Sequence, residues 1–219
     1  MPRVFHSPYG APIYADGSPV AASVATLAAL KALSDLGDLV HGNEVTVDAD
    51  GSKWRFHSSS ALTGDDILVA TPDATAYASA GRWLRAVGRT TLYLPFSFAT
   101  ADGATLLTVP TGCVIKLDSA HWKITADMTG GSSSAIGIDS SVDTTAGDLL
   151  GGSGGDVAAA LTAGVKAGTV GTVMDTDAEL HSKLLPAAAT VRFQRITSAF
   201  TAGSGYVGLV VDILANPGA

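Results

Sequence analysis

The glycine-rich run Gly151-Gly152-Ser153-Gly154-Gly155-Asp156 is the first stretch whose residue types could do chemistry. Free backbone N–H groups at the start of a helix bind phosphate, and such a run can supply them. The spacing does not fit this use, because no G-x-x-x-x-G-K-[ST] pattern occurs and Asp156 would place a negative charge at the phosphate site. We interpret the run as a flexible loop, followed by a short helix with Asp156 as its N-cap that ends near Ala163.

Other residues with ligand chemistry lack the spacing of a metal site. Asp175, Asp177 and Glu179 alternate like calcium ligands, but the twelve-residue loop with its central glycine and terminal glutamate is absent. An exposed acidic turn is favoured. The histidines show no i, i+4 or paired spacing typical of zinc sites; they are His6, His41, His57, His121 and His181. We therefore predict no metal ligand and no cofactor.

Nucleophilic catalysis is also not indicated. No G-x-S-x-G sequence marks a serine nucleophile, so a Ser-His-Asp set drawn from this serine-rich chain would be arbitrary. Cys113 is the single cysteine, which excludes an internal disulfide framework, and we expect it to be a buried apolar thiol. The sequence predicts no catalytic residue and a protein that is not an enzyme.

The composition points to contact with other proteins. The chain of 219 residues has 13 basic and 20 acidic residues, a net charge of -7, which argues against a nucleic-acid surface. Only 15% of the residues are charged and 47% are hydrophobic, whereas ordinary soluble domains are roughly 25% charged. We expect part of the surface to be buried in a permanent oligomer or particle. A composition that is merely rich in alanine and glycine is the alternative.

No membrane span or export signal is expected. The longest apolar region, residues 20–36, is interrupted by polar and charged residues such as Lys31 and Asp35. The first eight residues lack the apolar region of a secretory signal, so we expect synthesis and use without export.

The first part of the chain is predicted to be an extended N-terminal arm, residues 1–17, followed by a helix over residues 19–36. The arm contains Pro2, Pro8 and Pro12, and when extended it reaches on the order of 50 Å, enough to lie along a neighbouring subunit; a frayed terminus is the alternative. Ser18 is the expected N-cap of the helix and Pro19 its first residue. The helix packs either on its own sheet or against copies of itself.

A small α+β module over residues 18–90 follows from the pattern after this helix. Asp50-Gly51 between the strand-like runs 44–49 and 52–56 predicts a type I′ hairpin, with Trp54 and Phe56 on one face. Further strands are expected at 66–70 and 81–87. Aromatic residues should lie inside this module and arginines at its rim, although stacked aromatic and arginine residues are also typical of sugar binding.

Residues 91–219 are predicted to form an antiparallel β-sandwich that is jelly-roll-like, so the fold class is mainly β. Short strands are expected at 93–99, 105–109, 113–117 and 121–128, the last with one wet face. The runs in 190–214 read as a β-hairpin around the turn 201–205, and the second run should be central or covered on both faces. Residues 130–171 are expected to be a long loop that makes intersubunit contacts.

Two stretches resemble proteins of tailed bacteriophages. The segment Gly64-Asp65-Asp66-Ile67-Leu68-Val69-Ala70-Thr71-Pro72-Asp73, with Ala80-Gly81-Arg82-Trp83-Leu84-Arg85 and the hairpin at 50–56, resembles a small module of phage structural proteins that occurs in tail fibres and in heads. The second half, with residues 129–137, Gly147-Asp148-Leu149-Leu150-Gly151-Gly152 and the closing residues 191–207, is similar to the C-terminal domain of minor capsid or decoration proteins. The likeness covers roughly residues 38–214 and implies synthesis in a host cytoplasm.

This resemblance implies a capsid decoration protein, a virion structural protein that sits as a homotrimer on the outer surface of the head and contacts the major capsid protein. We expect no nucleic-acid or membrane partner. The candidate contact with the shell or a neighbour lies in the arm, at Pro2, Arg3, Val4, Phe5, Pro8 and Tyr9. The candidate trimer contact lies in the helix, at Val24, Leu27 and Leu30.

Two alternatives stay open at this point. The first is a tail-fibre or baseplate protein that binds a host surface glycan, which the front module also permits. Residues 130–171 contain no aromatic residue, which favours the shell, since a receptor-binding loop should expose aromatic side chains. The second alternative is a nonviral oligomeric scaffold.

Overall fold

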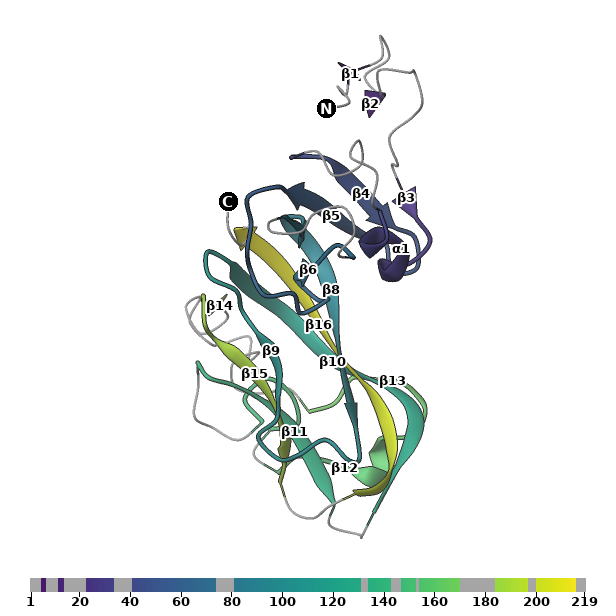
Figure 1. Cartoon of the computed structure of the whole chain (residues 1–219). Coiled ribbons are helices and arrows are strands. Elements are labelled where there is room, and N and C mark those ends of the chain that lie inside the picture. Colours follow the sequence, from purple (N-terminus) through teal and green to yellow (C-terminus); the bar gives the residue numbers. More distant parts are fainter. Residues whose placement is uncertain are drawn as a thin grey trace. The chain divides into compact units, whose positions relative to one another are not determined.

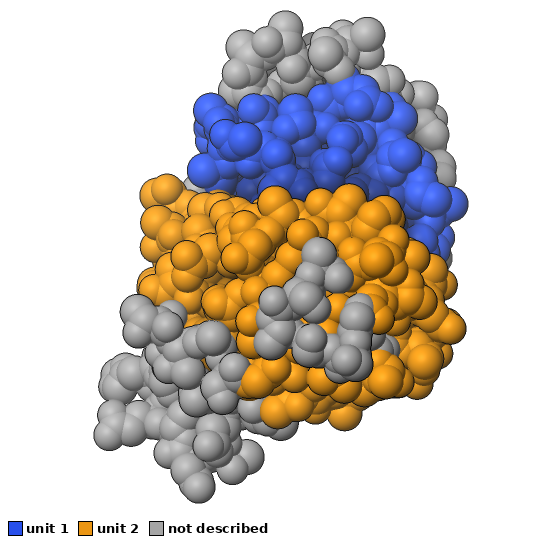
Figure 2. All heavy atoms as spheres, turned by 90° about the horizontal axis from the view of Figure 1, so that it is seen from below, with its two compact units in different colours: residues 1–86, 216–219 blue, residues 87–215 orange. Residues whose placement is uncertain are grey.

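The chain is mainly β and forms two compact units (Figures 1 and 2). The computed structural model describes residues 5–6, 12–13, 23–33, 41–73, 81–130, 134–142, 147–152, 154–169, 184–196 and 200–215. Unit 1 comprises residues 1–86 and 216–219, and unit 2 residues 87–215, whereas the sequence placed this boundary after residue 90. Within the described ranges, no helix is long and apolar enough to cross a bilayer.

Unit 1 is built on a five-stranded sheet of order β3-β4-β5-β7-β6, with one parallel pair, β3 and β4. Its strands are β3 (Ser23–Val24), β4 (Glu44–Val47), β5 (Ser52–His57), β6 (Val69–Ala70) and β7 (Arg82–Arg85). The predicted hairpin is confirmed as β4 and β5, but its connection has four residues, 48–51, rather than the two of a type I′ turn. The strand pair stops at Val47 because the N–H groups of Asp48 and Ala49 donate instead to Val24 and Ala25.

The predicted helix over residues 19–36 is wrong in its start and its length. The structure has a strand at Ser23–Val24 and then the short helix α1 (Leu27–Lys31). Thr26, not Ser18, is the N-cap, and its side-chain oxygen accepts from the N–H of Ala29 at 3.2 Å. Sheet pairing of the β-branched Val24 with Val47 overrides the local helical pattern.

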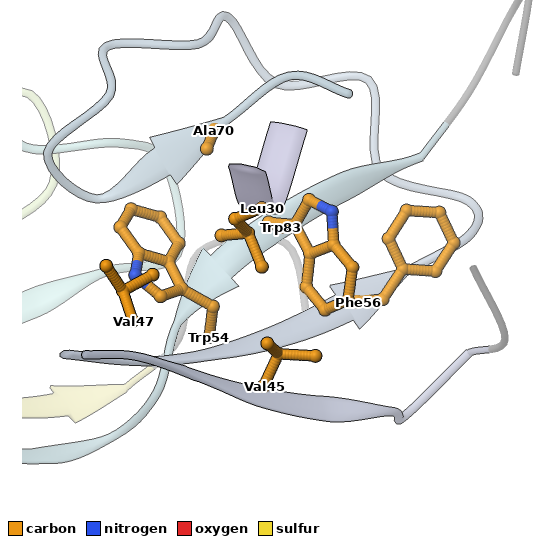
Figure 3. Close-up of a cluster of buried hydrophobic side chains, with 7 residues drawn as sticks. All are labelled: Leu30, Val45, Val47, Trp54, Phe56, Ala70 and Trp83. Carbon is orange, nitrogen blue, oxygen red and sulfur yellow. The ribbon is translucent and has the colours of Figure 1, made fainter. Parts of the chain in front are cut away.

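The core of unit 1 joins α1 to the sheet (Figure 3). Leu30 projects from the helix toward the aromatic side chains of β5 and β7 and has no exposed surface. The core consists of Leu30, Val45, Val47, Trp54, Phe56, Ala70 and Trp83, with Val24, Leu27 and Leu33 packed against it. The trimer contact predicted at Leu30 is therefore wrong, because this side chain is used by its own unit; Val24 and Leu27 are half-buried against the same cluster.

Arg85 is buried, although the sequence placed arginines at the rim of this unit. The side chain is 5% exposed, and its guanidinium lies 5.6 Å from the centre of the Trp54 ring. It donates to the carbonyl of Ile67 at 3.2 Å and lies 3.5 Å from a carboxylate oxygen of Asp50. Burial lowers the pKa of Arg85, and the charge of Asp50 opposes that shift. The arginine thus ties the hairpin turn to the segment before β6.

The predicted extended arm folds back on itself. Strand β1 (Phe5–His6) pairs with β2 (Pro12–Ile13) in antiparallel register, with Phe5 opposite Ile13. A chain that reverses within ten residues does not reach the length of a straight arm. Of the predicted shell contacts, Phe5 lies in β1, and the other positions lie outside the described residues; they are Pro2, Arg3, Val4, Pro8 and Tyr9.

Unit 2 consists of two antiparallel sheets. The first has the order β13-β10-β16-β8, with β14 also paired to β10, and the second has the order β12-β11-β15-β9. The first sheet uses β8 (Gly88–Ser97), β10 (Val114–Gly130), β13 (Gly164–Lys166), β14 (Leu184–Leu185) and β16 (Phe200–Ala215). The second uses β9 (Thr105–Thr108), β11 (Ala135–Ser140), β12 (Asp156–Val157) and β15 (Thr190–Arg195). Strands β10, β16 and β8 run side by side (Figure 1).

The two sheets face each other across an apolar core, as in a β-sandwich. Phe96 of the first sheet stacks on Phe193 of the second with ring centroids 5.5 Å apart, and it meets Trp122 edge-on at 5.4 Å. The alternation predicted for 121–128 is confirmed at Trp122, which is buried in the core, and at Lys123, which is exposed on the wet face. It breaks at Ala126, which is exposed where the register of β10 with β16 shifts. Cys113 is buried, as expected.

The predicted hairpin at 190–214 is wrong. Strand β15 belongs to the second sheet and β16 to the first, so the two neighbours in sequence never pair. The run 201–205 is part of β16 and not a turn. Gly205 is needed there because a Cβ at this position would lie 2.7 Å from the carbonyl oxygen of Lys123. The central position predicted for the last strand is confirmed, since β16 lies between β10 and β8.

The predicted long loop at 130–171 is also wrong, because it contains β11, β12 and β13. The expected helix after Asp156 is replaced by β12 and a 3-10 turn, η1 (Ala158–Ala160). Part of the glycine run is packed: Gly151 is buried, and a Cβ on it would lie 2.7 Å from the carbonyl oxygen of Ile136, whereas Gly154 is exposed. The predicted strands 113–117 and 121–128 are parts of the single strand β10.

Candidate interaction surface

The outer face of the first sheet in unit 2 gathers two tyrosines, a lysine and a histidine. Tyr93 comes from β8, His121 and Lys123 from β10, and Tyr206 from β16; we call these four residues the tyrosine face. The register places Gly208 opposite both Tyr93 and His121, and Lys123 opposite Tyr206. Directly opposed residues in antiparallel strands project to the same side, so all four side chains lie on one surface.

The four side chains hold one another in place. The Lys123 ammonium lies 4.7 Å from the centre of the Tyr93 ring and 5.9 Å from that of Tyr206, both within cation–π range. The Tyr93 ring meets the rings of His121 and Tyr206 edge-to-face, at centroid distances of 6.2 and 6.3 Å. Such pairs are favoured by the charge distribution of aromatic rings. The arrangement is therefore pre-organised.

Gly208 makes room for this cluster at its centre. A Cβ on Gly208 would lie inside van der Waals contact of Nε2 and Cε1 of His121 and 3.0 Å from Cδ2. The histidine ring thus lies directly over the β16 backbone, in the space that a side chain would occupy. Burial lowers the pKa of His121, and the charge of Lys123 lowers it further.

The tyrosine face is partly open. Tyr93 is 38% exposed and Tyr206 is 37% exposed, while Val165 beside them is 69% exposed. Val165 is opposite Lys123, Lys123 is opposite Tyr206, and Tyr206 is opposite Pro95, so one row crosses β13, β10, β16 and β8. Tyr93 follows in the next row, so an aliphatic residue, a lysine and two tyrosines form a continuous surface.

Lys123 forms no ion pair with any described residue. The ion pairs between described residues are Lys31–Asp66, Arg85–Asp50 and Arg89–Asp118. In a chain with a net charge of -7, an unpaired lysine held between two aromatic rings is a local positive site.

No metal centre is found among the described residues. These residues contain no group of three or more His, Cys, Asp or Glu side chains placed to hold a metal. His41 and His57 meet edge-to-face at 4.9 Å, a pairing that the sequence did not predict. His181 and the acidic residues at 175, 177 and 179 lie outside the described part.

The buried carboxylates act as structural acceptors. Asp156 accepts from Nε1 of Trp122 at 2.6 Å and from the hydroxyl of Thr169 at 2.7 Å. Asp148 accepts from the backbone N–H and the hydroxyl of Ser140 at 2.6 and 2.5 Å. Both carboxylates already accept hydrogen bonds from other residues of the fold, so they are poorly suited to act as an acid or base on a substrate.

Comparisons of the chain with protein-family models, with curated proteins and with solved structures find no match. What this surface can bind therefore follows from its own geometry and not from a relative. Strand alternation placed His121 with Lys123 on a wet face, and it placed Tyr206 with Gly208 on one face that was predicted to be covered. Only the sheet register shows that Tyr93 lies on the same face as these residues, and the sequence carries no local signal for that register.

Proposed function

We propose that the chain is a virion structural protein of a tailed bacteriophage, a decoration protein that binds the outside of the head as a trimer and stabilises the shell. The observation that carries the proposal is the low charged fraction of 15% in a mainly β chain, which supports burial of surface in an assembly. The resemblance of roughly residues 38–214 to phage structural proteins supports a virion as that assembly.

Stabilisation of a shell by such a protein is additive. Each copy would bury on the order of 1,000 Å² against the major capsid protein and its own neighbours. A trimer joins three such contacts, so each later contact forms at a high effective concentration. Many moderate contacts together then oppose the outward pressure of packed DNA.

Light scattering after size-exclusion chromatography tests the assembly state. A solution mass of three times the 22.0 kDa monomer supports the trimer. Adding the protein to undecorated heads, followed by sedimentation and heating, tests the role: binding in many copies and a higher temperature of shell opening are expected. Protein that stays in the supernatant at every concentration contradicts the decoration role.

A tail-fibre or baseplate protein that binds a host surface glycan is the second candidate. The exposed aromatic pair Tyr93 and Tyr206 favours it, because aromatic rings on an open sheet face are typical of sugar binding. Copy number separates the two candidates. A decoration protein is present in many copies on each particle and on tailless heads, whereas a fibre subunit is present in few and only on tails.

A further inference from the structure

We propose that the tyrosine face binds a carbohydrate that carries a carboxylate group. Tyr93 and Tyr206 supply the aromatic surface and Lys123 the charge. This inference concerns unit 2 by itself, and it does not depend on whether the protein sits on a head or on a tail.

Charge complementarity identifies the ligand as an anion. The Lys123 ammonium has three N–H donors and forms no ion pair with a described residue. On the same face, Arg89 forms an ion pair with Asp118. His121 adds ring nitrogens beside Lys123, and its half-buried ring is fixed over Gly208. The register sets Lys116, another lysine of β10, opposite the acidic Asp212, whereas Lys123 is opposite the uncharged Tyr206, so the positive charge available to an anion lies at the tyrosines.

The size of the aromatic surface identifies the ligand as small. The two tyrosines are 37% and 38% exposed, which corresponds to about 150 Å² of side chain when each tyrosine contributes about 200 Å². A stable protein interface needs about 800 Å² on each partner. One or two sugar rings match the smaller area, and a protein partner would have to find most of its contact elsewhere.

The chemistry of the four side chains fits a sugar acid. The C–H groups of a pyranose ring carry partial positive charge and are attracted to the faces of aromatic rings. The lysine ammonium donates a charge-assisted hydrogen bond to the carboxylate. Tyrosine hydroxyls and the imidazole both donate and accept, as sugar hydroxyls require. Because the residues stand on paired strands and contact one another, little side-chain entropy is lost on binding.

The test is an NMR titration of the full chain that follows the tyrosine ring signals. The probes are sialyllactose and trigalacturonic acid, with lactose and methyl-esterified trigalacturonic acid as their uncharged counterparts. We expect at least one acidic sugar to shift the Tyr93 and Tyr206 signals and to bind about tenfold more tightly than its counterpart. Failure of both acidic sugars to shift these signals, or equal affinity for charged and uncharged forms, overturns the proposal.

Variants assign the binding to the tyrosine face. Lys123→Gln should abolish the preference for the acidic sugar, and Tyr206→Ala should weaken binding about tenfold, while Tyr206→Phe keeps the ring and most of the affinity. Lys53→Gln is the matched control, since Lys53 is an exposed strand lysine of unit 1. Binding that is unchanged in Lys123→Gln and Tyr206→Ala contradicts the proposal. A fall in solution mass in Tyr206→Ala would assign the face to a second copy of the chain and also overturn it.

Discussion

The contact between Gly208 and His121 predicts a substitution whose effect changes sign. Gly208→Ala places a methyl group well inside van der Waals distance of the His121 ring, so the ring must move by about 1 Å or more. Overpacking of this kind costs about 1–3 kcal/mol. Alanine is also about 0.5–1 kcal/mol better than glycine in a strand interior. In the wild-type background the variant should therefore lose about 1 kcal/mol of stability.

The same substitution should stabilise the protein once the ring is removed. The three atoms nearest to a Cβ on Gly208 all belong to His121. In a His121→Ala background only the backbone gain of about 0.5–1 kcal/mol is left. A double-mutant cycle should thus give a coupling energy of about 1–3 kcal/mol between the two positions.

Urea unfolding combined with hydrogen exchange of the β16 amides measures this coupling, because the exchange reports on unit 2 alone. Gly205→Ala is the matched control in the same strand. A Cβ there meets the backbone of Lys123 and Ile124, so its cost should be equal with and without His121. The reasoning is refuted if Gly208→Ala costs the same in both backgrounds.

Substitutions at three further positions test buried and half-buried polar groups, each by unfolding. Asp156→Ala leaves the indole N–H of Trp122 buried without its acceptor and should cost about 3 kcal/mol in urea, with Asp156→Asn costing less. Asp65→Ala removes one carboxylate oxygen that accepts from three backbone N–H groups and should lower the stability of unit 1 by about 1–3 kcal/mol, again in urea; an unchanged midpoint would contradict this. The pKa of His57 is lowered by burial and then by the charge of His41, so the folded state binds fewer protons than the unfolded state. The free energy of unfolding should be highest above about pH 6.5 and fall as the pH decreases below it. His57→Gln should reduce the change of the melting temperature with pH between about pH 5 and 8.

Local patterns predicted those elements whose signals are local. The Asp50-Gly51 pair and the alternation of Trp54 and Phe56 identified the β4–β5 hairpin, and the alternation through Trp122 identified the wet face of β10. Both depend on turn chemistry and on a period of two, which a single strand carries in its own sequence.

The failures arise where tertiary contacts use a residue differently from its usual local role. Gly203 and Gly205 look like turn residues, but in β16 they allow close approach to β10, a contact with residues about eighty positions away in sequence. Asp156 looks like an N-cap, but its carboxylate holds the Trp122 indole. Alanine-rich residues around Val24 look helical, but the parallel pair with β4 prevails. None of these partners is visible from the flanking sequence.

The position of β16 has a consequence for biosynthesis. Strands β8 and β10 do not pair with each other, and both pair with β16. In the β10–β16 pair, Gly130 is opposite Phe200 and Val114 is opposite Ala215. Until β16 is made, β8 has no partner in this sheet, and β10 can pair only with the short strands β13 and β14. Long-range pairing of this kind is slow to form. The first sheet of unit 2 can therefore be completed only after β16 emerges, and a chain that stops before Phe200 should be retained by chaperones or aggregate.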